Sequence, residues 1–388
     1  MITTVAVRGF RSLREVVLPL GKVTLVTGAN GVGKSSLYRS LGLLGQAAEG
    51  SLVASLARQG GLGAVLWAGP EVISTAMRSG EQPVQGKGKR INPVSLGLGF
   101  CTEDLGYLID VGLPSPRPTM FVHDPEIKRE LIFGAPVMRP ASTLVRRKHS
   151  RVEARQDRWE LVMENLPEQL SILSELSEPN LYPELVAIRQ EVRNWRFYDS
   201  FRTDAAAPAR GLHINTWTPV MAADGSDLVP ALQTIRESAF CEPLEQAVAR
   251  AFPGGRIAVA DSGTRMELQF SQHGILRPLT AEDLSDGTLR FLLLAAALLS
   301  PRPPRLLVLN EPETSLHPQM LPALAELIIA ASKRTQIVVV SHASGLVDGL
   351  REGLGDDLEH HELIKDTGET MVAGRGIFDR PVWDWGSR

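Results

Sequence analysis

Near its amino terminus the chain reads Gly28-Ala29-Asn30-Gly31-Val32-Gly33-Lys34-Ser35. An apolar run at 23–27 precedes this stretch, and a helical pattern follows it over 35–44. The pattern G-x-x-x-x-G-K-[ST] between a strand and a helix is typical of a phosphate-binding loop, because glycines let backbone N–H groups approach phosphate oxygens. In such a loop Lys34 reaches the β- and γ-phosphates of a nucleotide, and Ser35 is a ligand of Mg²⁺. We call residues 28–35 the phosphate loop; a chance glycine-rich turn is the disfavoured alternative.

The composition excludes several classes of protein. The 388 residues include 41 basic and 44 acidic ones, so the overall charge gives no argument for nucleic-acid binding. The two cysteines, Cys101 and Cys241, are too few for a disulfide framework and fit a reducing compartment. The amino terminus does not resemble a signal peptide, and the longest apolar run, 291–299, is far shorter than the about 20 residues of a membrane span. We therefore expect a soluble cytoplasmic protein with no membrane partner.

A second apolar strand ends in polar residues in the last third of the chain. Residues 306–311 read Leu-Leu-Val-Leu-Asn-Glu. Nucleotide hydrolases usually carry at this point an acid that holds the Mg²⁺ shell, and here the residue is Asn310. Glu311 follows directly, where a carboxylate can act as the base that orients attacking water. The alternative is an ordinary buried strand with a polar end, which the other motifs disfavour.

A helix start lies upstream of this strand. Residues 284–288 read Leu-Ser-Asp-Gly-Thr, so Ser285 and the following N–H groups can form an anion site at a helix N-terminus. Taken alone, the stretch is equally an ordinary N-cap. Its position gives it weight: Ser285 lies 25 residues before Asn310, and His342 follows the strand expected at 336–340.

Phosphate loop, signature serine, Walker B strand and switch histidine in this order resemble an ABC-type ATPase. The opening Gly9-Phe10-Arg11-Ser12 and the string Glu311-Pro312-Glu313-Thr314-Ser315-Leu316-His317-Pro318 resemble the RecF, OLD and SMC group, in particular stand-alone predicted ATPases of RecF type. The separation of 251 residues between Lys34 and Ser285 disfavours a transporter subunit, in which it is far smaller. The resemblance covers 1–45 and 280–350 strongly.

The resemblance implies how these motifs act on ATP and Mg²⁺. In this group two heads form a dimer around two ATP molecules, each held on one protomer's phosphate loop and under the signature of the other. The residues expected at the nucleotide are Arg11, Asn30, Gly31, Gly33, Lys34, Ser35, Ser36, Ser285 and Gly287. The residues expected to act in hydrolysis are Lys34, Glu311 and His342, and those expected at Mg²⁺ are Ser35 and Asn310. We therefore expect ATP and Mg²⁺ as cofactors and a homodimer on ATP binding.

Two departures from the family pattern stand out. Asn310 replaces the usual acid, which predicts slow hydrolysis. A Q-loop glutamine is not evident, and Gln59 is a candidate for it. The resemblance also implies that residues 315–317 form the D-loop, a segment at the interface between the two protomers.

The predicted fold class is α/β, a P-loop NTPase of ABC-ATPase type with a mixed or parallel core sheet, an antiparallel β subdomain and a helical insertion lobe. The expected domains are 1–140 (first part of the ATPase head), 141–250 (inserted hairpin and helical lobe) and 251–388 (second part of the head). In the first two domains we expect antiparallel strands at 94–100, 105–112 and 119–123, an exposed loop at 80–90, a hairpin over 142–155 and helices over 159–200. In the third we expect paired strands at 256–260 and 265–270, helices at 286–299, 318–332 and 344–352, strands at 305–309 and 336–340, and a hairpin around 366–368.

The densest basic stretch is Arg146-Arg147-Lys148-His149-Ser150-Arg151, followed by Arg155 and Arg158. It is either a solvated hairpin, diluted by nearby acids, or a surface for the phosphates of double-stranded DNA. The resemblance implies as the favoured function an ATP-driven dimerisation switch in DNA repair or in genome and phage defence. The alternative is an ATP-sensing regulatory subunit of a protein effector encoded nearby, without DNA binding, and a third is a nucleotide-binding module that barely hydrolyses ATP. From the short stretch after the ATPase motifs we expect no nuclease domain of the kind that OLD proteins carry there.

Overall fold

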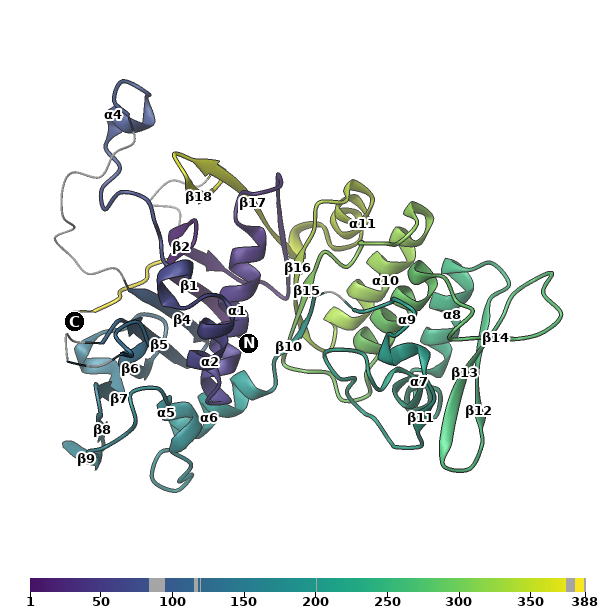
Figure 1. Cartoon of the computed structure of the whole chain (residues 1–388), viewed down its shortest axis with the longest axis horizontal. Helices are drawn as coiled ribbons and strands as arrows, with labels where there is room; N and C mark the ends of the chain where they lie inside the picture. Colours follow the sequence, from purple (N-terminus) through teal and green to yellow (C-terminus); the bar gives the residue numbers. More distant parts are fainter. Residues whose placement is uncertain (84–94, 115–117, 119, 200, 375–380, 387–388) are drawn as a thin grey trace. The chain divides into compact units, whose positions relative to one another are not determined.

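The computed structural model describes residues 1–83, 95–114, 118, 120–199, 201–374 and 381–386 (Figure 1). The chain divides into two compact units, which are described separately. Unit 1 contains Met1–Gly21, Val26–Trp195 and His361–Arg388, and unit 2 contains Lys22–Leu25 and Arg196–His360. Residues 84–90 of the loop expected at 80–90, residue 94 and residue 119 lie outside the described residues. The predicted division into three domains stays a prediction, because these units reflect packing alone.

Unit 1 is built on an eight-stranded sheet in its described part, with the order β2-β1-β4-β5-β6-β7-β8-β9. Every neighbouring pair is antiparallel. The strands are β1 Ile2–Phe10, β2 Leu13–Pro19, β4 Leu96–Thr102, β5 Leu105–Gly112, β6 Glu126–Gly134, β7 Thr143–Lys148, β8 Arg151–Arg155 and β9 Trp159–Met163. The predicted strands at 105–112 and the hairpin over 142–155 are confirmed, and β4 covers the described part of the strand expected at 94–100.

Two expectations in this region are wrong. Residues 120–123 form an exposed turn rather than a strand, and β6 begins after it. Residues 159–163 form a strand rather than a helix: Trp159, Leu161 and Met163 recur at a spacing of two, which is the period of a strand. The prolines after this strand then separate it from the helices that do form.

The two faces of this sheet are covered differently. The helices of unit 1 are α1 Lys34–Ala48, α2 Leu52–Arg58, α3 Leu62–Val65, α4 Thr75–Arg78, α5 Ile172–Glu175 and α6 Pro183–Arg193, with the turn η1 Pro140–Ser142. Helices α1 and α6 contact strands of the sheet (Figure 1). Phe100 of β4 meets Trp195 after α6, with ring centroids 5.1 Å apart. On the other face Trp385 packs with Cys101, Phe133 and Met138. The sheet therefore has two apolar faces near β1 and β4.

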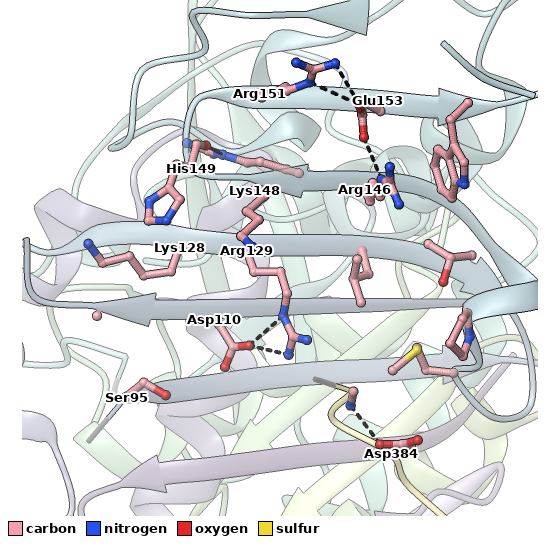
Figure 2. Close-up of a pocket in the computed structure, with 18 of the residues that line it drawn as sticks. Ser95, Asp110, Lys128, Arg129, Arg146, Lys148, His149, Arg151, Glu153 and Asp384 are labelled. Atoms are coloured by element: carbon pink, nitrogen blue, oxygen red, sulfur yellow. Dashed lines mark hydrogen bonds and ion pairs between the residues drawn. The ribbon is translucent and has the colours of Figure 1, made fainter. Parts of the chain in front are cut away.

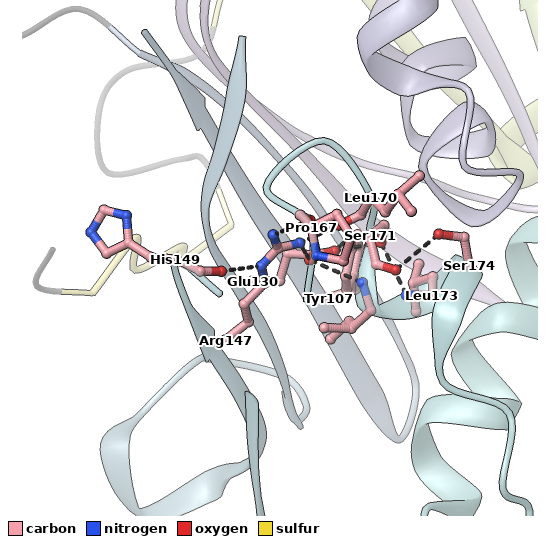
Figure 3. A network of polar contacts seen from close by, with 10 residues as sticks. Tyr107, Glu130, Arg147, His149, Pro167, Leu170, Ser171, Leu173 and Ser174 are labelled. Carbon is pink, nitrogen blue, oxygen red and sulfur yellow. Dashed lines mark hydrogen bonds and ion pairs between the residues drawn. The ribbon is translucent and has the colours of Figure 1, made fainter. Parts of the chain in front are cut away.

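A buried ion pair fixes the centre of the sheet to the segment before α5. Glu130 of β6 and Arg147 of β7 are cross-strand partners, and their charged atoms lie 2.8 Å apart with neither side chain exposed. Arg147 also donates to the carbonyl oxygens of Pro167, Leu170 and His149. Figure 3 shows these contacts converging from both sides of the pair.

Glu130 completes the network by accepting hydrogen bonds. The donors are the Tyr107 hydroxyl at 2.6 Å, the Ser171 hydroxyl at 2.5 Å and the amide of Ile172 at 3.0 Å (Figure 3). Burial and the adjacent Glu130 carboxylate raise the pKa of Tyr107 well above its ordinary value. Each charge is thus both paired and hydrogen-bonded, which is the condition for burying it.

We expect Arg147→Met to destabilise unit 1 by about 3–5 kcal/mol, because it leaves the Glu130 carboxylate buried without its counter-charge. Chemical denaturation of the full chain measures this difference. The double variant Arg147→Met with Glu130→Leu should recover only part of the loss, since no unpaired charge remains but the buried donors that faced Glu130 lose their acceptor. A single variant as stable as the wild type would contradict this account of the pair.

Unit 2 contains a parallel sheet buried on both faces. β10 Arg196–Tyr198, β15 Leu306–Asn310 and β16 Gln336–Val340 are parallel neighbours in this order, and β3 Val23–Gly28 follows β16. All residues of β15 and β16 are buried, as expected for parallel strands between helices. β10 is a correction, because the sequence predicted helices up to residue 200.

Helices and a second sheet complete unit 2. The helices are α7 Leu228–Arg236, α8 Cys241–Ala251, α9 Asp286–Leu298, α10 Leu321–Ser332 and α11 Ser344–Leu354, with the turns η2 Pro208–Arg210, η3 Pro318–Met320 and η4 Gly355–Asp357. The second sheet contains β11 His213–Ile214, β12 Arg256–Asp261, β13 Arg265–Ser271 and β14 Leu279–Thr280. The predicted alternation of strand and helix after residue 286 and the pairing of β12 with β13 are confirmed.

The last hairpin is β17 Leu358–Asp366 with β18 Glu369–Val372, and it confirms the turn expected at 366–368. From His361 onward it belongs to unit 1. Within the described part of the chain, no helix is both long and apolar enough to cross a membrane.

Candidate functional site

The phosphate loop of unit 1 joins the end of β3 to the first turn of α1. Gly28 has a φ of 140° and Gly33 a φ of 119°, which side chains rarely adopt. A Cβ at Gly28 would lie 2.3 Å from the carbonyl oxygen of Leu363, and one at Gly33 would lie 2.3 Å from Oγ1 of Thr370. Glycine is therefore required at both positions by conformation and by space.

Lys34 and its neighbours occupy the start of α1. The Lys34 side chain is buried, and its Nζ donates to the carbonyl oxygens of Gly28 at 2.6 Å and Ala29 at 3.1 Å. Asn30, Gly31 and Ser35 are exposed, whereas Ser36 is buried. The Lys34 ammonium thus points at the loop, and the tip of the loop faces solvent. This arrangement suits a phosphate, which could accept hydrogen bonds from the ammonium and from the loop amides.

The carboxyl-terminal hairpin supports the loop, a role that the sequence did not reveal. Thr370 of β18 donates to the carbonyl oxygen of Val32 at 2.6 Å. Nζ of Lys365 in β17 donates to the carbonyl oxygen of Gly31 at 3.3 Å. Thr370 also lies 2.8 Å from the hydroxyl of Ser12. The hairpin signal was visible in the sequence, but nothing in it indicated which segment the hairpin would pack against.

Arg11 lies at the turn between β1 and β2 with a φ of 51°. Its guanidinium donates to Oε1 of Gln59 at 3.3 Å, and Gln59 is the candidate for the Q-loop glutamine. Burial and the nearby Arg39 lower the pKa of Arg11.

In unit 2 the carboxyl end of β15 carries Asn310 and Glu311. Asn310 Nδ2 donates to Oδ1 of Asp199 at 2.7 Å, while Asn310 Oδ1 is buried and has no hydrogen-bond partner among the described residues. A buried acceptor without a donor is unusual and fits a water of a cation shell. Asp199 was not among the predicted site residues, because residues up to 200 were expected to be helical.

Glu311 adopts a φ of 46°, a left-handed conformation that is uncommon for a residue other than glycine. His342 lies near it, with Nδ1 3.8 Å from Oε1 of Glu311 and 3.3 Å from Oε1 of Glu313. Glu313 is buried and also accepts from the Ser341 hydroxyl at 2.8 Å and the His342 amide at 2.9 Å. Glu313 therefore fixes the segment that carries His342, a role that its place in the quoted string could have suggested.

The signature residues lie at the start of α9 in unit 2. The Ser285 hydroxyl accepts from the Thr288 amide at 3.2 Å, so it is the N-cap of this helix. A Cβ at Gly287 would lie 2.7 Å from the carbonyl oxygen of Ser315, whose φ is 65°. The signature and the expected D-loop thus contact each other through backbone, which explains the glycine.

Arg210 anchors the approach to α9 and was also missed. Its guanidinium donates to the carbonyl oxygens of Ala281 and Leu284, each at 2.8 Å, and to the carboxylate of Asp286 at 2.9 Å. In the sequence it is a single arginine after an alanine-rich stretch, with no pattern that would single it out.

The sequence-predicted residues thus fall into two groups. Unit 1 contains Arg11, Asn30, Gly31, Gly33, Lys34, Ser35 and Ser36, and unit 2 brings Glu311 close to His342 and also contains Asn310, Ser285 and Gly287. Each group has its own chemistry: the glycine amides, ammonium and hydroxyl of unit 1 suit phosphate oxygens, and the amide oxygen of Asn310 in unit 2 suits a Mg²⁺ shell.

The expected basic stretch lies along an open pocket of about 1320 Å³ on unit 1. Lys128, Arg146, Lys148 and Arg151 line it, and Figure 2 shows them on successive strands of the sheet. Arg147 is turned to the other face, because neighbouring residues of a strand alternate. Arg147 is therefore unavailable to a ligand of this surface, which corrects its place in the predicted basic patch.

A family model described as "AAA domain, putative AbiEii toxin, Type IV TA system" matches residues 139–348, more than half of the chain. The chain belongs to this family. This confirms an ATPase domain of the AAA family as the predicted class, and the α/β fold of the chain is as predicted. Comparison with curated protein sequences found no match.

Solved structures of SMC head domains are similar to the chain. A head bound to the C-terminal winged-helix domain of ScpA is 14% identical, with a TM-score of 0.49 and 96% of each chain covered. A head with an extended coiled coil, bound to the C-terminal domain of ScpA from Pyrococcus furiosus, is 12% identical, with a TM-score of 0.48 and coverage of 96% of this chain and 95% of that one. The head domain from Thermotoga maritima is 14% identical, with a TM-score of 0.44 and coverage of 97% and 99%.

Proposed function

We propose that this chain binds ATP with Mg²⁺ at the phosphate loop and hydrolyses the ATP slowly, with Glu311 as the base that orients water. The observation that supports this most directly is the loop conformation, in which Gly28 and Gly33 leave no space for a side chain and Lys34 points at the loop carbonyls. Backbone amides at a helix start and an ammonium in the same turn are a phosphate-binding arrangement.

The remaining roles follow from the chemistry of the side chains. Ser35 and Asn310 would hold the Mg²⁺ shell through oxygen, the ligand that this cation prefers. When bound, Mg²⁺ would neutralise charge on the phosphate oxygens. Glu311 accepts a proton from water, and His342, whose Nδ1 lies 3.8 Å from that carboxylate, orients it and senses the γ-phosphate.

Lys34→Ala should weaken ATP binding about 10- to 100-fold, because it removes a charge-assisted bond of about 1.5–3 kcal/mol to the phosphates. A fluorescent ATP analogue measures the affinity, and a phosphate-release assay measures turnover. Lys333→Ala, at an exposed lysine of unit 2, is the control and should behave as the wild type. Equal ATP affinity and turnover in the Lys34 variant would remove the phosphate-loop assignment.

We further propose that ATP drives formation of a symmetric homodimer. The resemblance to ABC-type heads assigns Ser285 and Gly287 of one protomer to the ATP of the other, so ATP would form part of an isologous interface. Support comes from the exposed hydroxyl of Ser285 at a helix start, whose N–H groups attract anions.

Glu311→Gln should retain ATP, because it keeps the shape of the side chain and removes the base. Light scattering with MgATP should then report a dimer at micromolar protein, whereas adding Ser285→Arg to the same variant should return a monomer. Glu326→Gln, an exposed glutamate on α10, is the matched control for the charge change. A Glu311→Gln protein that stays monomeric up to tens of micromolar with MgATP would contradict the ATP-driven homodimer.

A second candidate is that the switch acts on double-stranded DNA, in repair or genome defence. The pocket in Figure 2 carries Lys128, Arg146, Lys148 and Arg151 on one surface, and Arg146 stacks over Trp159 at 4.0 Å. Glu153 pairs with both Arg146 and Arg151 and reduces the net positive charge. If DNA does not bind, the alternative of an ATP-sensing subunit that regulates a protein effector is favoured.

DNA affinity through this surface should fall steeply with salt and be independent of sequence. Changing Arg146, Lys148 and Arg151 to Glu should reduce the slope of log affinity against log salt by about 2 to 3, one per lost phosphate contact. The control reverses Arg256 and Arg265, exposed arginines of β12 and β13 in unit 2. Fluorescence anisotropy measures this, and no binding at low salt with or without ATP would exclude the DNA candidate.

A further inference from the structure

The carboxylate that Asn310 lacks is present on the neighbouring strand. β10 and β15 are parallel, and the pairing of Tyr198 with Leu309 brings the next residues, Asp199 and Asn310, side by side. Their side chains meet, with Asn310 Nδ2 2.7 Å from Asp199 Oδ1. The contact lies within unit 2.

Chemistry fixes the direction of this hydrogen bond. An ionised carboxylate only accepts hydrogen bonds, so the amide group facing Asp199 is the NH₂ of Asn310. Its oxygen, Oδ1, must then point away from Asp199. That oxygen is buried and has no partner among the described residues. The NH₂ group of Asn310, which a cation shell would repel, is thus bound to Asp199. The Oδ1 acceptor stays available to a cation shell.

A buried guanidinium holds the two strand ends together. Arg290 of α9 donates through Nη2 to the carbonyl oxygen of Asp199 at 3.2 Å and to that of Glu311 at 3.3 Å. Burial lowers its pKa, and the charges of Asp199, Glu313 and Glu311 act in the opposite direction. Asp199 is therefore held in place by its backbone as well as by its side chain.

We propose that Asp199 supplies the negative charge of the Mg²⁺ site that residue 310 supplies in other ATPases of this class, and that it turns the Asn310 oxygen toward the cation shell. The inference rests on the proposed function, since it concerns the same MgATP site. Asp199 is a positioning residue, acting through Asn310 and through its charge.

Asp199→Asn separates the two effects. The amide oxygen introduced by this substitution can still accept from Asn310, so orientation is kept while the charge is lost. The Mg²⁺ concentration that half-saturates binding of a fluorescent ATP analogue should rise about tenfold, the effect of losing an outer-shell partner of a metal site. Nucleotide binding without Mg²⁺ should not change. Asp204→Asn, which removes an exposed aspartate paired with Arg202, is the control and should leave the Mg²⁺ curve unchanged.

A charge exchange tests the same idea from the other side. The double variant Asp199→Asn with Asn310→Asp moves the carboxylate to β15 and keeps a donor opposite it, so the Mg²⁺ requirement should return to that of the wild type or fall below it. Asn310→Asp alone places two carboxylates together, and because a cation relieves their repulsion, the Mg²⁺ requirement should fall below that of the wild type. Binding of Mn²⁺, followed by paramagnetic resonance in the presence of nucleotide, gives a readout independent of hydrolysis.

The outcomes separate this inference from the proposed function. An Asp199→Asn protein with the Mg²⁺ curve and Mn²⁺ affinity of the wild type would overturn the inference alone. So would a loss of nucleotide binding that Mg²⁺ cannot restore and that persists in the exchanged variant, since it would indicate a structural role. A wild-type protein that binds no nucleotide, with or without Mg²⁺, would overturn the proposed function and this inference with it.

Discussion

In a parallel sheet the carboxyl ends of all strands meet at one edge, and unit 2 uses that constraint to gather its polar groups. β10 ends before Asp199, β15 ends in Asn310 and β16 ends before Ser341. The strands themselves are apolar and buried, so polar groups can begin only where the strands end. Glu313 then joins two of these ends by accepting from Ser341 and the His342 amide. One rigid sheet thereby sets distances among side chains that come from distant parts of the sequence.

The phosphate loop obeys a different constraint, which is local. Positive φ at Gly28 and Gly33 and the close approach of Leu363 and Thr370 make the loop a property of backbone and space rather than of side-chain packing. Such a loop is readable from sequence, because only glycine satisfies it and the required residues are contiguous. Its support by Thr370 is not readable, since that contact joins residues more than 300 positions apart.

The same distinction explains what sequence could and could not predict elsewhere. Long alternating or fully apolar segments, such as those of β15 and β16, were predicted with their bounds nearly correct. β9 and β10 were taken for helices, because a short strand beside a proline-rich helical region gives few periods to count. Missing β10 concealed Asp199, the acid at its end. Arg147 was placed on the basic surface because the residues were read as a charge run and not by strand alternation, which turns it inward to Glu130.

The position of the negative charge has a physical reason. Asn310 is 9% exposed, whereas Asp199 is exposed. The charged carboxylate therefore lies at the end of β10, which water reaches, and the neutral amide lies at the buried end of β15. An ionised group at 310 would have to be desolvated beside Glu311 and Glu313, and the Arg290 guanidinium carries one positive charge against these three carboxylates. Before the cation arrives, that arrangement would cost stability. Placing the carboxylate one strand away keeps its attraction for a cation while leaving it hydrated, and the weaker Coulomb attraction at the longer distance is the cost.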